Sequence, residues 1–168
     1  MRFLKSLAVL LGASTAIATP LSNAEQKAQL ERLVAAVLPI AEQLLNAHGE
    51  YYPFGATMSS DGKISNVAGY TGDEHPKSSE LISFLKAAFT SQAASTTIMA
   101  SALIYDVRTI PPGATEKSDA IAIDLDHRDG MSITMLIPYR FDPDKKVSLG
   151  EAFATKGAGA IFFRPAGG

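Results

Sequence analysis

Cysteine is missing from this chain of 168 residues, and its absence excludes several properties at once. No disulfide can stabilise the fold, so the packing of the core must hold it together. A cysteine nucleophile is excluded, and so is a lipid anchor attached to a cysteine. Stability and function must therefore come from other side chains.

The usual signatures of enzymes and metal sites are also missing. Beyond residue 24 there is no Gly-x-Ser-x-Gly elbow, phosphate-binding loop or His-Glu-x-x-His segment. The three histidines, His48, His75 and His127, show no metal-ligand spacing. Gly157 and Gly159 do not follow a strand, as the glycines of a dinucleotide site do, so we interpret them as a flexible turn. We therefore expect no catalytic residue, no metal and no cofactor.

The first 24 residues have the features of a secretory signal peptide. A short basic start precedes an apolar run over residues 6–18, which is too short to span a bilayer. Small residues permit cleavage after Ala18 or after Ala24, and we favour Ala24 because Glu25 then opens a helical pattern. No later apolar run approaches the length of a membrane span. We expect a periplasmic or secreted protein that keeps no stable membrane anchor after cleavage.

Charge of one sign is not concentrated anywhere in the rest of the chain. Cleavage removes Arg2 and Lys5 from 15 basic and 17 acidic residues, so the formal net charge falls from −2 to −4. A general surface for nucleic acid or anionic membranes is therefore not expected. The 144 residues that remain after 24 are removed suffice for one domain with its own core.

Hydrophobic periodicity predicts helices in three places. Residues 25–47 carry an amphipathic stripe, in which Pro39 should kink the helix or split off its last two turns. A second helix is expected over residues 76–93, with a proline in its first turn. The segment 148–156 allows a short third helix.

Alternating and β-branched segments predict an antiparallel sheet. Residues 54–70 read as a hairpin around an Asp-Gly turn, and further strands are expected over residues 97–109 and from residue 120. A three-residue loop, Arg128-Asp129-Gly130, fixes the register of the last hairpin, because it gathers the large apolar side chains on one face. The paired residues are His127 and Met131, Leu125 and Ile133, Ile123 and Met135, and Ile121 and Ile137.

The element order α-β-β-α-β-β-β predicts one α+β domain over residues 25–168. We expect about five antiparallel strands flanked by two or three helices, an order similar to that of profilin-like and roadblock-like domains. The sequence also resembles a pattern found in small exported bacterial proteins of unassigned function, which implies no particular chemistry. The segments that carry it are Tyr52-Pro53-Phe54-Gly55, Asp61-Gly62, Ser118-Asp119-Ala120-Ile121, Asp126-His127-Arg128-Asp129-Gly130 and Pro138-Tyr139.

The densest group of polar residues contains Asp124, Asp126, His127 and Arg128. On a strand, the two aspartates project to the same face about 7 Å apart. Paired carboxylates can perform acid and base chemistry or hold a hard cation. His127 falls on the apolar side of the predicted hairpin, where a structural role is the more common one.

Asp106 and Arg108 on the preceding strand would extend this group into a shallow acidic patch. The alternative is that these polar residues form the solvated end of a hairpin, where Asp129 before Gly130 is explained by turn chemistry. Two aromatic segments offer a second candidate surface, because aromatic residues and arginine dominate interface hot spots. Their candidate binding residues are Tyr52, Phe54, Tyr139 and Arg140.

Three functions fit these features. The first is an exported, non-enzymatic binding domain that recognises a protein partner, as an inhibitor or an immunity factor does. The second is a small hydrolase or metal-dependent enzyme that uses Asp124, Asp126 and His127. The third is a sensory domain that binds a small molecule between sheet and helix. If the first function is correct, we expect that replacing Asp124, Asp126 or His127 with alanine leaves folding nearly intact.

Overall fold

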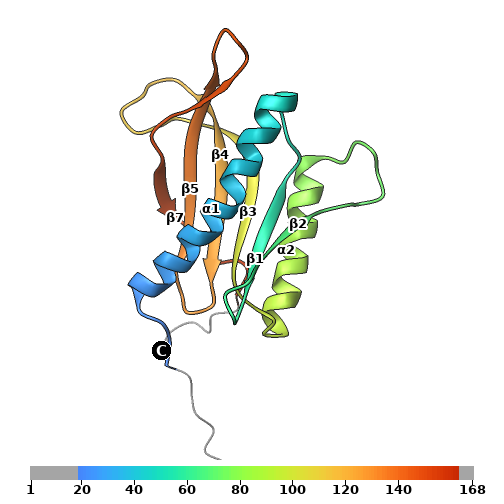
Figure 1. The fold of residues 1–168 in the computed structure, drawn as a ribbon, viewed down its shortest axis with the longest axis vertical. Helices are drawn as coiled ribbons and strands as arrows, with labels where there is room; N and C mark the ends of the chain where they lie inside the picture. Colours follow the sequence, from blue (N-terminus) through green and yellow to red (C-terminus); the bar gives the residue numbers. More distant parts are fainter. Residues whose placement is uncertain (1–18, 163–168) are drawn as a thin grey trace, which may run out of the picture.

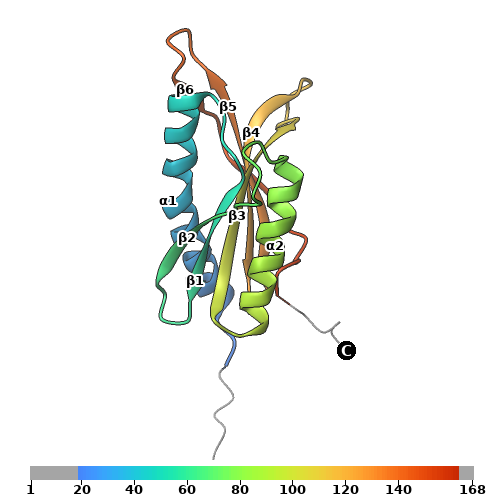
Figure 2. The same cartoon turned by 90° about the vertical axis from the view of Figure 1, so that its right-hand side faces the viewer.

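The computed structural model describes residues 19–162, and the basic start and apolar run of the predicted signal lie outside them. One antiparallel sheet carries helix α1 (Asn23–His48) on one face and helix α2 (Ser78–Ala94) on the other (Figures 1 and 2). The strands are β1 (Phe54–Ser59), β2 (Ile64–Ala68), β3 (Ile98–Thr109), β4 (Ser118–His127), β5 (Ser132–Phe141), β6 (Val147–Leu149) and β7 (Phe153–Lys156). The expected α+β fold is confirmed.

Helix α1 forms because its apolar stripe meets the sheet and both of its ends are capped. Ser22 and Glu25 make a reciprocal capping box at the start, and Gly49 ends the helix in the left-handed region with φ +77°. The helix runs unbroken through Pro39, whose side chain is exposed, so it is not split there. The buried stripe consists of Leu30, Leu33, Val37, Ala41 and Leu45.

The sheet has the order β2-β1-β3-β4-β5-β6, and β7 also pairs with β5. The predicted register of the last hairpin is confirmed, since Ile121, Ile123 and Leu125 lie opposite Ile137, Met135 and Ile133. The His127 amide donates to the Met131 carbonyl at 2.9 Å across the three-residue loop. The local turn and the apolar pattern therefore fix this register together.

The two faces of the sheet carry separate apolar clusters. The larger one lies under α1 and includes Ile104 and Ile123. The smaller one lies under α2, where Leu85 and Phe89 cluster with Ile161 and Phe162, the last residues that the structure describes. Neither described helix is both long enough and apolar enough to cross a membrane.

The segment after β5 differs from the prediction. Residues 147–156 form the short strands β6 and β7 instead of a helix, which brings the sheet from about five strands to seven. Both pair with β5, so they cover an edge that would otherwise expose a row of unpaired backbone groups. Gly157 is held beside β5 and does not form the expected flexible turn, because its amide donates to the Ser132 carbonyl at 3.0 Å and a Cβ at this position would clash with Ser132 and the Ile133 amide.

Candidate functional site

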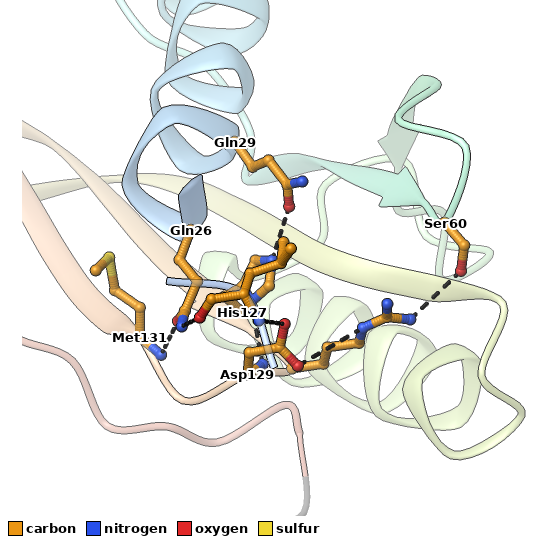
Figure 3. Close-up of polar contacts among 8 residues, drawn as sticks. Gln26, Gln29, Ser60, His127, Asp129 and Met131 are labelled. Atoms are coloured by element: carbon orange, nitrogen blue, oxygen red, sulfur yellow. Dashed lines mark hydrogen bonds and ion pairs between the residues drawn. The ribbon is translucent and has the colours of Figure 1, made fainter. Parts of the chain in front are cut away.

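Two residues of the predicted polar group at the β4–β5 turn, Asp126 and His127, are buried, whereas Arg128 is exposed. Figure 3 shows His127 beside the start of α1. The His127 imidazole is fully buried under α1, with Nε2 2.8 Å from Oε1 of Gln29. Its Nδ1 accepts the backbone N–H of Asp129 at 3.0 Å. Because Nδ1 is an acceptor, Nε2 carries the proton and donates to Gln29. His127 therefore has a structural role in joining the turn to the helix.

Gln26 joins the same turn to the start of α1. Its amide is almost completely buried, donates to the Leu21 carbonyl at 2.8 Å and accepts the Met131 N–H at 2.9 Å. A carboxylate oxygen of Asp129 accepts the Leu21 N–H at 3.0 Å. The network of Leu21, Gln26, Gln29, His127 and Asp129, which we call the hairpin clasp, thus ties the first turn of α1 to the sheet.

Asp124 and Asp126 project to one face of the sheet, as expected, and that face is the one under α2. Asp124 accepts hydrogen bonds from Tyr105 at 3.1 Å and Thr134 at 2.8 Å, with Lys86 3.6 Å away. Burial, followed by the charge of Asp124, raises the pKa of Tyr105 to about 12. Asp126 is buried and accepts the Ile161 N–H at 3.1 Å. These contacts hold the sheet to α2 and to the segment around Ile161.

The grouping expected of an enzyme is not formed. His127 lies on the α1 face, opposite to Asp124 and Asp126, because neighbouring residues of a strand point to opposite faces. The expectation that the end of this hairpin is solvated is wrong for Asp126 and His127, which are buried, and holds for Arg128, which is exposed. Among residues 19–162, no group of three or more histidines and carboxylates is placed to hold a metal ion.

Asp106 and Arg108 do not extend Asp124 and Asp126 into an acidic patch. Asp106 pairs with Ile121 in register and so lies on the α1 face, where it accepts the Tyr139 hydroxyl at 2.9 Å. Burial, with a smaller contribution from Asp119, raises the pKa of Asp106, and burial beside Asp106 raises that of Tyr139. Arg108 pairs with Asp119 at 3.2 Å. The prediction of one patch is therefore wrong.

The two aromatic segments meet in the cluster under α1. Tyr51 contacts Phe54 edge to face with 6.0 Å between ring centroids, and Tyr139 contacts Phe141 in the same way at 5.7 Å. The Tyr51 hydroxyl is buried and has no hydrogen-bond partner within the described part of the chain. Burial, and then the nearby charge of Asp106, raises the pKa of Tyr51 above its usual range.

An open groove of about 780 Å³ lies between α1, the segment before β1, and β2. Tyr52 and Phe54 line it, as part of the predicted binding surface, and the Tyr52 side chain is 52% exposed. We call this site the edge groove. Its other lining residues are Ile40, Leu44, His48, Glu50, Tyr51, Pro53, Asn66, Val67, Ala68, Gly69 and Ser78.

The remaining predicted binding residues lie elsewhere. Tyr139 and Arg140 border a smaller hollow of about 370 Å³ beside β6, together with Pro111 and Ser118. Arg128 lies at the β4–β5 turn, where its guanidinium is 3.4 Å from the Ser60 hydroxyl. The eight predicted residues therefore belong to several sites, and two of them share the edge groove.

The edge groove is also lined by residues that are not among the predicted binding residues. Ile40, Leu44 and His48 follow one another at intervals of four, so they form a single row along α1 beside the buried stripe. That spacing is visible in the sequence. Asn66 and Ala68 carry no such signal, because only the folded sheet places them opposite this row.

No protein-family model, curated protein or solved structure matches this chain. The resemblance to small exported bacterial proteins and the similarity to profilin-like or roadblock-like domains therefore stay predictions.

Proposed function

We propose that this chain is an exported binding domain that recognises a protein partner through the edge groove, as an inhibitor or an immunity factor does. The observation that carries the proposal is an aromatic and aliphatic hollow at the rim of the sheet, with a half-exposed tyrosine, Tyr52, among its lining residues. Tyrosine in such a position supplies large contact area and a polar tip, which suits protein interfaces.

The enzyme hypothesis has less support from the geometry. Asp124 and Asp126 are on the face under α2 and are bonded to neighbouring residues, whereas His127 is held under α1. A small-molecule site is the second candidate, because the volume of the groove falls within the range of ligand pockets, about 300–1,000 Å³. The open course of the groove beside a strand favours a polypeptide over a small molecule.

Tyr52→Ala is expected to weaken partner binding at least tenfold, because loss of an interface tyrosine commonly costs about 2 kcal/mol. The partner would be isolated with the mature protein from its own periplasm or medium, purified, and titrated by calorimetry. Phe141→Ala is the matched control, since Phe141 is also exposed but does not line the groove. Equal affinities of Tyr52→Ala and the parent protein for the partner would reject the groove as the binding site. A separate assay tests the non-enzymatic function, which turnover of an ester, phosphate, peptide or glycoside substrate would reject.

We further propose that signal cleavage follows Ala18 and leaves Thr19 as the first residue, in place of the cleavage after Ala24 that the sequence alone favours. The support comes from the hairpin clasp and the capping box, which use Leu21 and Ser22, so that cleavage after Ala24 would remove both residues from the fold. Leu21 also packs against the large core cluster.

Intact-mass analysis of the exported protein is expected to show a chain that begins at Thr19. A shortened chain that begins at Glu25 should be less stable by about 2 kcal/mol, because it loses the cap and the contacts of Leu21. Chemical denaturation of the two chains measures the difference. An exported mass that begins at Glu25, or equal stability of the two chains, would contradict this assignment.

A further inference from the structure

The outer edge of β2 exposes a regular row of backbone groups. The Ser59 amide donates to the Lys63 carbonyl at 3.0 Å, which makes this a hydrogen-bonded pair of the β1–β2 hairpin. Bonded and non-bonded pairs alternate along an antiparallel ladder. Residues 65 and 67 therefore bond to β1, whereas the N–H and C=O groups of Ile64, Asn66 and Ala68 point away from it.

No other strand takes up these groups within residues 19–162. β2 is the terminal strand of the sheet and pairs with β1 alone (Figure 1). It contains neither the lysine nor the proline that commonly protects an edge strand. This edge therefore has three residues ready to pair with a further strand.

The opposite edge of the sheet is treated differently. There, β6 pairs with residues 139–141 of β5, and β7 pairs with residues 133–136. Between them, Pro138 has no N–H to expose, and its carbonyl accepts the Gly150 amide at 2.7 Å. The chain thus covers the β5 edge along its length and leaves the β2 edge open.

The edge groove lies directly beside the open edge. Asn66 and Ala68 line the groove, and their backbone N–H and C=O groups belong to the row that points away from β1. Their side chains are on the α1 side of the sheet, in register with Ala56 and Phe54, and both are short. A strand added to β2 would direct alternate side chains to that same side, into the space between β2 and α1.

We propose that the partner contributes an extended segment that adds to the sheet as a new strand beside β2 and inserts a large apolar side chain into the edge groove. This inference rests on the proposed function and specifies the chemistry of its partner. Main-chain hydrogen bonds would supply affinity and the groove would supply selectivity. Glu50 is the one carboxylate among the described residues that line the groove, and His48 is the one basic residue, so the groove favours a neutral or basic segment over an acidic one.

Asn66→Pro tests the inference, with Asn66→Ala as its matched control. Proline removes the outward N–H of residue 66 and leaves the bonds of β2 to β1 in place, whereas alanine removes only the side chain. The probe is a linear peptide of about ten residues, long enough for a strand of this length, selected from a phage-displayed random library against the mature protein. Asn66→Pro should weaken its binding about tenfold or more, and Asn66→Ala should not.

A second measurement needs no variant of the protein. Single N-methyl groups are placed along the selected peptide, since each removes one backbone donor. Binding should fall at alternate positions and persist at the positions between them, because only every second residue of a strand faces β2. Loss without this alternation, or equal binding of the peptide to Asn66→Pro and the parent protein, would overturn the inference.

The same peptide separates this inference from the proposed function. If Tyr52→Ala weakens its binding and Asn66→Pro does not, the groove is used and strand addition is wrong. If neither variant weakens it, both proposals fail. A dimer of the mature protein that Asn66→Pro dissociates would assign the edge to a second copy of the chain and would overturn strand addition by a partner.

Discussion

His127→Ala is expected to lower the free energy of unfolding by about 3 kcal/mol, although the residue adjoins a surface turn. Because His127 is buried, this result replaces the expectation from the sequence that alanine at this position leaves folding nearly intact. The substitution removes a fully buried ring and, with it, the hydrogen bonds to Gln29 and to the Asp129 amide. It therefore leaves a cavity and breaks the hairpin clasp. Urea denaturation of the variant and the parent protein measures the difference.

Arg128→Ala provides the control for this effect. The arginine is next in sequence but partly exposed, and its side-chain contacts with Ser60 and Asp129 are long, at 3.4 Å and 3.9 Å. Its loss should change stability by about 0.5 kcal/mol or less, as expected for a surface position. A His127→Ala variant as stable as Arg128→Ala would show that the clasp is not a structural element.

Gly55→Ala should destabilise the protein by about 3 kcal/mol because β1 and β3 leave no room for a methyl group. A Cβ on Gly55 would lie 2.5 Å from the Ala102 carbonyl oxygen and 2.7 Å from the Phe89 ring. The ring could move, but the carbonyl belongs to the backbone of the neighbouring strand. This packing gives a physical reason for the glycine in the Tyr52-Pro53-Phe54-Gly55 segment.

Gly113→Ala is the control variant, because it shows how much stability an alanine costs through backbone strain without steric overlap. Its stability is measured by thermal and urea unfolding. Gly113 has φ +78° and open space around it, so its substitution should cost about 1 kcal/mol from strain alone. Adding Phe89→Leu to Gly55→Ala should restore only part of the lost stability, since the contact with the carbonyl remains. Equal stabilities of Gly55→Ala and Gly113→Ala would contradict the steric argument.

Features that depend on local sequence could be predicted. The stripe of α1 repeats with the period of a helix, and the register at Arg128-Asp129-Gly130 follows from a short turn between alternating strands. The strands β6 and β7 could not be predicted from the sequence. Segments of three and four residues form strands only where the edge of β5 is already in place to pair with them.

The candidate site was predicted only in part for a related reason. Tyr52 and Phe54 stand out as aromatic residues close together in sequence, so the edge groove was partly anticipated. Asp106 was assigned to the wrong face because the long connection over residues 110–117 does not fix the register of β3 against β4. A shift of one residue there moves every side chain of a strand to the other face.

Amide NMR spectroscopy of the mature protein, titrated with its purified partner, tests the proposed binding site most directly. The account predicts that resonances change along β2 and around Tyr52, and that the amides of Ile64, Asn66 and Ala68 become protected from hydrogen exchange. Changes confined to the β4–β5 turn, or to the hollow beside Tyr139 and Arg140, would contradict it.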